Sequence, residues 1–398
     1  MKYNFDEHVN RRHTNSYKWD LMDGDDVIPM WVADMDFQAA KPIRDALARR
    51  VEQGVFGYEL VPDEYYKAVI SWFERRHQWK INREWMLYTT GVVPALSCTI
   101  KALTLPGEKV LVLTPVYNCF FSSILNQGCQ IAESELVREG DSYRIDFDDF
   151  ERKCADEKVS VFVLCNPHNP AGRVWTPEEL QHLNDICMRH HVKVISDEIH
   201  CELIMPGYKF TPFASVSAEC LDNSVTLNSP SKSFNIAGLQ MANIICKNEE
   251  WRRRIDRVIN IFEVCDVNSF APLAVQTAYN EGEEWLDQLN EYISSNYAEL
   301  KKIFHEYMPK IEILRLEGTY LVWADISALE FTSDELTEKL LKEGRVYVNS
   351  GTMYGRKAGQ GYIRINIACP RDTMTEGLIR MAKVLAPYME DEPLGCPA

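Results

Sequence analysis

Apolar residues repeat with two different periods along the middle of the chain, and the two periods alternate. Near-continuous apolar runs, which suit strands of a sheet buried on both faces, occur at residues 109–113, 159–165, 192–196 and 224–227. Between them, apolar positions recur every three or four residues, as helices require. The string Thr176-Pro177-Glu178-Glu179 predicts the capped start of one helix, and Pro62-Asp63 precedes another. Strands that alternate with helices predict an α/β domain with right-handed crossovers.

After about residue 285 the pattern is different. A long helix is predicted over 285–307, and a second helix over 333–343 has Gly344 just past its end. Short strands are predicted at 311–316, 320–324 and 362–367. This mixture is typical of a smaller α+β domain.

The length of the chain also favours two domains, because 398 residues exceed the usual size of a single hydrophobic core. We predict a large domain over residues 46–285 and a small C-terminal domain over 286–398. Residues 1–45 are predicted to form an N-terminal arm and part of the small domain.

Composition and charge narrow the class of protein. The hydrophobic fraction of 46% and the charged fraction of 26% are ordinary for a soluble globular protein. A net charge of -16 argues against nonspecific binding to nucleic acids or anionic membranes. The polar N-terminus lacks a signal-peptide core, and no apolar run approaches the roughly 20 residues that span a bilayer. We therefore expect a cytoplasmic protein with neither a nucleic-acid nor a membrane partner.

The cysteines point to the same compartment. Twelve are spread singly along the chain, without a C-x-x-C pair, and no H-E-x-x-H string is present. This pattern favours reduced, mostly buried thiols over disulfides or a metal site. We expect no bound metal.

Lys232 lies just past the predicted strand at 224–227, among the hydroxyl residues Ser229 and Ser231. The carboxyl ends of strands are where α/β sheets place ligands. Serine hydroxyls there can bind phosphate oxygens, and a lysine can form a Schiff base with an aldehyde cofactor. Taken alone, however, a Ser-x-x-Lys string is more often part of a surface loop.

Two other polar groups follow predicted strands. Asp197 comes after the strand at 192–196, where a carboxylate can keep the nitrogen of a pyridine cofactor protonated so that the ring accepts electrons. Asn169 stands in the rigid turn N-P-H-N-P-A-G at 166–172 and can donate a hydrogen bond to a phenolate oxygen. A helix-capping aspartate and a plain β–α turn are the structural alternatives.

Three more features complete the candidate site. The string T-T-G-V-V-P-A at 89–95 opens a predicted helix, whose backbone N–H groups form a ready phosphate site. Tyr117 follows another strand, and its ring can stack on a flat cofactor. Arg364 stands in an otherwise apolar strand and needs a partner. A bidentate bond to a substrate carboxylate supplies one, and a structural salt bridge is the alternative.

These motifs, in their order along the chain, resemble those of the fold-type I pyridoxal-phosphate enzymes, which form the aspartate-aminotransferase superfamily. Within it the chain is similar to the cystathionine β-lyase or C–S lyase branch of MalY/PatB type. The string P-M-W-V-A-D-M-D-F at 29–37 carries most of that similarity, with support from residues 5–6, 10–12, 16–20, 196–200 and 231–239. The resemblance implies an α/β fold of the PLP-dependent transferase type, with a mostly parallel seven-stranded sheet in the large cofactor-binding domain and a smaller α+β domain.

The resemblance also implies a role for each residue. Lys232, Asp197 and Tyr117 are the expected catalytic residues: Lys232 holds pyridoxal 5′-phosphate covalently, Asp197 pairs with the ring nitrogen, and Tyr117 stacks. The other residues expected to bind the cofactor are Asn169 and His200, and, at the phosphate, Gly91, Val92, Val93, Ser229 and Ser231. The partner subunit's Tyr58 is expected to reach the phosphate, which implies a homodimer with shared active sites. The amino-acid substrate is expected to contact Arg364, Ala33 and Tyr58, with Arg364 on its α-carboxylate.

Two positions depart from common relatives. Many carry a phosphate-binding arginine eight residues after the lysine, where this chain has Gln240, and many aminotransferases place a tyrosine where it has His200. Both departures fit the C–S lyase branch better, but they weaken the expected phosphate and ring-oxygen contacts. His200 is equally well explained as a core histidine.

Three functions remain open from the sequence. The first is β-elimination, in which Lys232 removes the α-proton of a sulfur amino acid and a thiol, pyruvate and ammonia are released. The second is transamination with the same cofactor. The third is a regulatory protein on a retained enzyme fold. The N-terminal string favours elimination.

Overall fold

The computed structural model describes residues 2–389 of the chain. Its largest sheet has seven strands in the order β2-β10-β9-β8-β7-β3-β4. All run in one direction except β10, which is antiparallel to both of its neighbours. The strands are β2 (Met86–Thr89), β3 (Lys109–Thr114), β4 (Gln130–Glu135), β7 (Val159–Cys165), β8 (Lys193–Asp197), β9 (Ser224–Asn228) and β10 (Ala242–Ile245). The predicted α/β class with a mostly parallel seven-stranded sheet is confirmed.

Helices cover both faces of this sheet, because successive side chains of each strand point to opposite faces. Val110 and Val112 of β3 pack into a core with α3, α4 and α8, whereas Leu111 and Leu113 pack with α5, α6 and α7 on the other face. Burial on both faces explains the continuous apolar runs. The helices are α3 (Val92–Leu103), α4 (Cys119–Asn126), α5 (Phe147–Cys154), α6 (Pro177–Arg189), α7 (Ala218–Asp222) and α8 (Glu249–Ile261).

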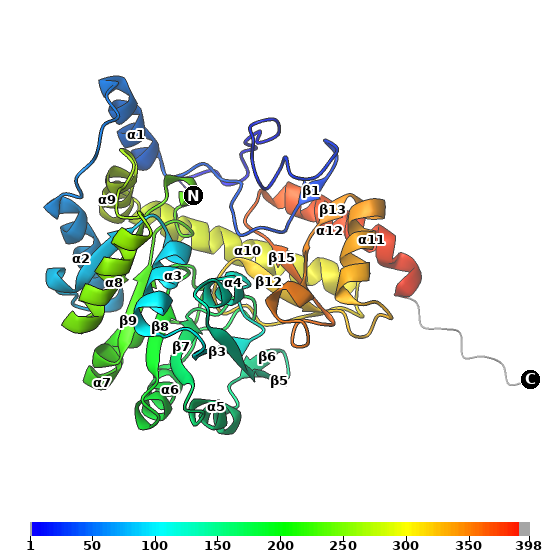
Figure 1. Ribbon diagram of the computed structural model, residues 1–398. Coiled ribbons are helices and arrows are strands. Elements are labelled where there is room, and N and C mark those ends of the chain that lie inside the picture. The colour runs from blue at the N-terminus through cyan, green and yellow to red at the C-terminus, as the bar shows by residue number, and fades with distance from the viewer. Residues whose placement is uncertain (1, 390–398) are drawn as a thin grey trace, which may run out of the picture.

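A second, antiparallel sheet has the order β11-β12-β15-β14. It shares a core with the helices that follow the large sheet, and Figure 1 shows α10 running from the side of the large sheet toward it. The elements are β11 (Glu312–Ile313), β12 (Leu321–Asp325), β14 (Asn349–Ser350), β15 (Tyr362–Asn366), α10 (Glu283–Tyr307), α11 (Ser333–Gly344) and α12 (Arg371–Leu385). A short hairpin, β5 (Val137–Glu139) with β6 (Ser142–Arg144), follows β4.

The N-terminal part of the chain reaches both sheets. Strand β1 (Ile28–Pro29) pairs in parallel with β13 (Val346–Tyr347), next to the small sheet. Helices α1 (Lys41–Gln53) and α2 (Asp63–His77) instead pack against α9 (Ala271–Glu281). The division into an N-terminal arm, a large domain and a small domain, with boundaries at 45 and 285, stays a prediction.

Two predicted details differ from the structure. Gly344 is the last residue of α11, and Arg345 takes the left-handed conformation that ends the helix. Gly344 serves close packing instead, because a Cβ there would lie 3.1 Å from Cγ2 of Val384 in α12. The strand expected at 311–316 is shorter, because Arg315 leaves the small sheet and its N–H donates to the carbonyl of Asp141.

The structure of residues 2–389 bears on two expectations from composition, the absence of a membrane-spanning segment and the state of the cysteines. No helix in that range is both long and apolar enough to cross a membrane. The eleven cysteines described there are free thiols, and nine of them are buried. The twelfth, Cys396, lies outside the described residues.

Candidate active site

The polar residues that follow four neighbouring strands meet in one cavity. Tyr117 follows β3, Asn169 follows β7, Asp197 ends β8, and Lys232 follows β9. These are the carboxyl ends of adjacent parallel strands, where ligands bind in open α/β sheets. The lining residues are Ala33, Thr90, Gly91, Val92, Val93, Pro94, Tyr117, Cys165, Asn169, Asp197, Ile199, His200, Ser231, Lys232, Ala237 and Gln240. Ten of the thirteen predicted site residues are among them; Ser229, Arg364 and Tyr58 are not.

Lys232 supplies the amine of the cavity. Its Nζ donates a hydrogen bond of 2.6 Å to the carbonyl oxygen of Ala33. Burial lowers the pKa of Lys232, and the positive charge of Arg364 lowers it further, although Asp34 and Asp197 oppose this. A lowered pKa makes the neutral amine available, and both attack on an aldehyde and removal of a proton require that form.

Asp197 is a buried carboxyl without a cationic hydrogen-bond partner among the described residues. Burial raises its pKa to about 7, although the N–H of Ile199 at 3.1 Å from Oδ1 and the charge of Lys232 lower it. A carboxylate in such a place is stabilised when a cation pairs with it. A protonated pyridine nitrogen is a cation of suitable size.

His200 and Tyr117 both line the cavity. His200 is 3% exposed, and its Nδ1 has no hydrogen-bond partner among the described residues. Burial, together with the nearby Lys232 and Arg364, lowers the pKa of His200 to about 3, so the imidazole is neutral. His200 therefore lines the cavity with an unpartnered ring nitrogen, and its contact with a cofactor stays a prediction. Burial also raises the pKa of Tyr117 well above its usual value.

The amino end of α3 forms one corner of the cavity. Gly91 is the N-cap, and no side chain caps the helix, so the first backbone N–H groups, at Val92 and Val93, stay available to an anion. Ser231 lines the same cavity. The Oγ of Ser229 lies 2.6 Å from that of Ser231 and donates to the carbonyl of Met241. Ser229 therefore holds Ser231 in place from behind the cavity wall.

Arg364 reaches the site from β15 of the small sheet. Its Nη1 donates to Oδ1 of Asn169 at 3.0 Å, and its Nη2 donates to the carbonyl of Trp31 at 2.8 Å. Its Nε is buried without a partner, and the guanidinium makes no salt bridge within residues 2–389. The structural salt bridge considered from the sequence is therefore absent there. A guanidinium that bonds a residue of the cavity wall and has no carboxylate partner in the described chain is suited to the carboxylate of a ligand.

Tyr58 does not join the cavity of its own chain. It lies between α1 and α2 and is 98% exposed. Its neighbours Val55, Phe56 and Leu60 are exposed as well. The sequence expectation placed this residue in the site of a partner subunit, and its position is compatible with that expectation.

Six lining residues were not predicted as site residues: Thr90, Pro94, Cys165, Ile199, Ala237 and Gln240. Thr90, Pro94 and Ile199 are immediate chain neighbours of predicted residues, so extending those motifs by one residue would have found them. Gln240 is different, because it was noted only as a replacement for an arginine. It lines the cavity with a left-handed backbone, φ 55°.

Comparison with known proteins agrees with this geometry. The model of the family "Aminotransferase class I and II" matches residues 26–381. The chain belongs to the class I and II aminotransferase family. Cystathionine beta-lyase PatB of Bacillus subtilis (strain 168), for example, is 42% identical over 96% of this chain and 100% of its own length.

Solved structures of similar proteins share the same fold. Cystalysin from Treponema denticola, which contains pyridoxal 5′-phosphate, has a TM-score of 0.94 at 36% identity and covers 98% of this chain and 100% of its own. The PLP-bound C-S lyase from Staphylococcus hominis has a TM-score of 0.90 at 33% identity, with the same coverage. This aminotransferase-family chain therefore resembles these two cofactor-bound proteins, one of them a C-S lyase, over nearly its whole length.

The residues of the cavity fit the cofactor of these relatives. The uncapped start of α3 offers N–H groups to a phosphate, and the buried carboxyl of Asp197 lacks the cation that a ring nitrogen provides. His200 has an unused ring nitrogen, and the amine of Lys232 faces the same space. Pyridoxal phosphate would supply an anion for the start of α3, a cationic ring nitrogen for Asp197 and an aldehyde for Lys232.

One other cluster of side chains could in principle bind a metal ion, but its hydrogen bonds explain it as an ion pair. His77, Cys201 and Glu202 offer ligand atoms within 4.8 Å of one another. The carboxylate of Glu202 already accepts hydrogen bonds from His77, Trp72 and Arg76. The positive Arg76 opposes a second cation, so the cluster is better described as a buried ion pair.

Proposed function

We propose that this chain is a pyridoxal-phosphate-dependent C–S β-lyase, which converts cystathionine or another cysteine S-conjugate and water into a thiol, pyruvate and ammonia. The observation that carries the proposal is that the amine of Lys232 and the buried carboxyl of Asp197 line one cavity, while Arg364 bonds Asn169 in the wall of the same cavity. The 42% identity to a cystathionine β-lyase favours elimination over transamination.

The chain's own groups divide the work of the reaction. When bound, pyridoxal phosphate supplies an aldehyde for amines and a ring that accepts electrons. Asp197 keeps negative charge beside the ring nitrogen, and Arg364 holds the α-carboxylate of the amino acid. The neutral Nζ of Lys232 takes the α-proton as a general base. The carbonyl of Ala33, 2.6 Å from Nζ, can accept a hydrogen bond from the resulting ammonium.

Incubation with cystathionine in the absence of a keto acid tests the proposal. A lyase releases thiol and pyruvate steadily, because the free cofactor-bound enzyme is regenerated in each cycle. A transaminase stops after a single turnover, because the amino group stays on the enzyme. Continuous pyruvate release therefore supports the proposal, and a stalled first turnover assigns the site to transamination.

Replacement of Arg364 by alanine should raise the KM for the amino acid. The variant loses two charge-assisted hydrogen bonds to the carboxylate, so kcat/KM is expected to fall about 100-fold. Arg364→Lys keeps the charge but loses the forked geometry and should recover only part of the loss. Steady-state kinetics checks this, and an unchanged KM in Arg364→Ala would assign the carboxylate to another group.

We further propose a homodimer in which the partner subunit's Tyr58 completes each site. The exposed apolar residues around Tyr58 support this, because Val55, Phe56 and Leu60 are 67%, 55% and 88% exposed in the single chain. Such a contiguous apolar group is typical of a surface that another protein covers. We also propose a cytoplasmic location, which the free, mostly buried cysteines support.

Mixing two defective variants tests the shared site. The Lys232→Ala variant lacks the amine but keeps Tyr58. The Tyr58→Ala variant keeps the amine of Lys232 but lacks the tyrosine side chain. In a mixed dimer, one of the two sites recovers both residues, so about a quarter of all sites should regain activity at limiting cofactor after random subunit exchange. Activity no greater than the sum of the two separate variants would contradict a shared site.

A further inference from the structure

The segment Trp31–Phe37 runs between the two groups that the reaction uses most. The carbonyl of Trp31 accepts the hydrogen bond from Nη2 of Arg364 at 2.8 Å, and the carbonyl of Ala33 accepts the one from Nζ of Lys232 at 2.6 Å. Two carbonyls that stand two residues apart therefore orient the carboxylate-binding residue and the catalytic base. The position of this backbone controls both.

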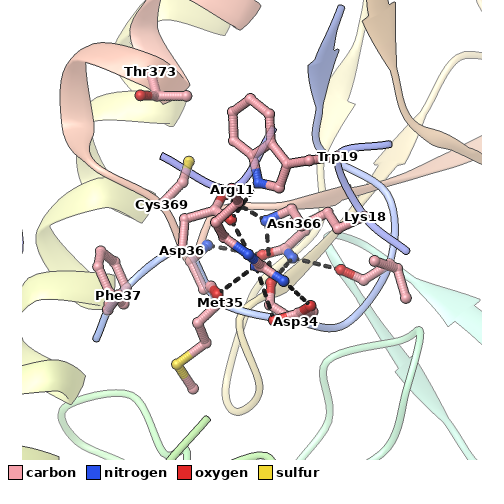
Figure 2. A network of polar contacts seen from close by, with 12 residues as sticks. Arg11, Lys18, Trp19, Asp34, Met35, Asp36, Phe37, Asn366, Cys369 and Thr373 are labelled. Atoms are coloured by element: carbon pink, nitrogen blue, oxygen red, sulfur yellow. Dashed lines mark hydrogen bonds and ion pairs between the residues drawn. The ribbon is translucent and has the colours of Figure 1, made fainter. Parts of the chain in front are cut away.

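Asn366 holds the segment from the side of Arg364. It is buried in β15, two residues beyond Arg364, and its Nδ2 donates to the carbonyls of Val32 at 2.6 Å and Asp34 at 2.8 Å. Figure 2 shows the amide of Asn366 beside this backbone. Its own N–H also donates to the carbonyl of Met30 at 2.9 Å.

Asn235 holds the segment from the side of Lys232, three residues along the chain. Its Nδ2 donates to the carbonyls of Met35 at 3.0 Å and Phe37 at 2.8 Å, and its Oδ1 accepts the N–H of Met35 at 3.2 Å. Asn235 has a left-handed backbone, φ 55°, which asparagine tolerates better than most residues. A short amide in this conformation reaches both acceptors.

Charged groups fix the side chains of the same segment to the N-terminal arm. Arg11 pairs with Asp34 at 2.7 Å and with Asp36 at 2.9 Å, and the buried Lys18 pairs with Asp36 at 2.7 Å. Figure 2 shows these contacts converging on residues 34–36. Arg11 also donates to the carbonyl of Met35 at 2.9 Å, and Lys18 donates to that of Asp34 at 3.1 Å, so the arm and the two asparagines hold the same stretch of backbone.

We infer that Asn366 and Asn235 are positioning residues, which hold Trp31–Phe37 so that its carbonyls orient Arg364 and Lys232. The inference rests on the proposed function, because it assigns those two residues to carboxylate binding and proton transfer. Asn366 stands two residues from Arg364 and holds the residues on both sides of Ala33, so it acts on substrate binding and on the chemical step, whereas Asn235 acts on the chemical step.

The test compares Asn366→Ala and Asn235→Ala in the cofactor-loaded protein. Asn366→Ala should raise the KM for the amino acid and the Kd for propionate, a carboxylate without an amine, about tenfold each, and it should also lower kcat. Asn235→Ala should lower kcat about tenfold with a smaller change in KM. Hydrogen exchange should become faster in the peptide that contains residues 31–37 in both variants.

Asn296→Ala is the matched control. Asn296 is as buried as Asn366, and its Nδ2 also donates to two backbone carbonyls, those of Ile367 and Cys369 at 3.0 Å each, but it makes no hydrogen bond to Trp31–Phe37. Its kinetic constants and the exchange of residues 31–37 should stay near those of the original protein. If Asn366→Ala does not fold, Asn366→Ser replaces it in every measurement.

The inference is overturned if both variants match Asn296→Ala in KM, in kcat and in the exchange of residues 31–37. It is also overturned if exchange increases without a change in KM, kcat or propionate binding. Absence of pyruvate release from the unmodified protein would instead refute the proposed lyase activity. The propionate and exchange measurements would still report on the two asparagines in that case.

Discussion

Lys232→Ala is expected to abolish pyruvate release, with a fall in kcat of about 10⁴-fold or more. The variant loses the amine that takes the α-proton, and the other lining residues provide no equivalent: His200 is neutral with a pKa of about 3, and burial raises the pKa of Tyr117 well above its usual value. The measurement is pyruvate formation from cystathionine at saturating cofactor.

Lys193→Ala is the matched control for this prediction. Burial also lowers the pKa of Lys193, which stands at the opposite end of the same sheet, at the start of β8 and outside the cavity. Its replacement should leave kcat within about threefold of the original value, as is usual for a change away from the reacting atoms. Near-normal turnover in Lys232→Ala would remove that residue from the mechanism.

Asp197→Asn is the second large expected effect, with a fall in kcat of about 10²–10³-fold. The amide keeps the shape of the side chain but removes the negative charge beside the ring nitrogen, so the ring is a weaker acceptor of electrons. The decrease should appear in kcat and in kcat/KM together, because the interaction matters most in the transition state. Steady-state kinetics with cystathionine measures both constants.

The neighbouring Glu198 provides the control. It is also buried, and burial raises its pKa to about 8, but its carboxyl bonds Ser196 and the N–H of Phe213 rather than facing the cavity. Glu198→Gln should keep most of the activity. Equal losses in Asp197→Asn and Glu198→Gln would mean that the effect comes from the local fold and not from a charge beside the cofactor.

Much of the large sheet is predictable because its strands are local patterns. The apolar run at 159–165 coincides with β7, and Thr176 forms the expected capping box at the start of α6. The positions of Tyr117, Asn169, Asp197 and Lys232 follow from the same patterns. Each comes at or just after a strand end, and parallel strands bring those ends to one edge.

Contacts between distant parts of the chain were not predictable in this way. Arg364 and Asn169 are 195 residues apart, and Lys232 and Ala33 are 199 residues apart, yet each pair is joined by a hydrogen bond. The resemblance to a known family suggested that these residues share a site. It did not reveal that Ser229 stands behind Ser231, because that depends on side-chain packing.

The central claim is that the amine of Lys232 holds the cofactor. Reduction of the cofactor-loaded protein with sodium borohydride makes a bond between an amine and an aldehyde permanent, and mass spectrometry of the digested protein locates it. The account predicts the added mass of reduced pyridoxal phosphate on the peptide that contains Lys232, and nowhere in the Lys232→Ala variant. The same mass on another lysine, or its absence from the original protein, would contradict the account.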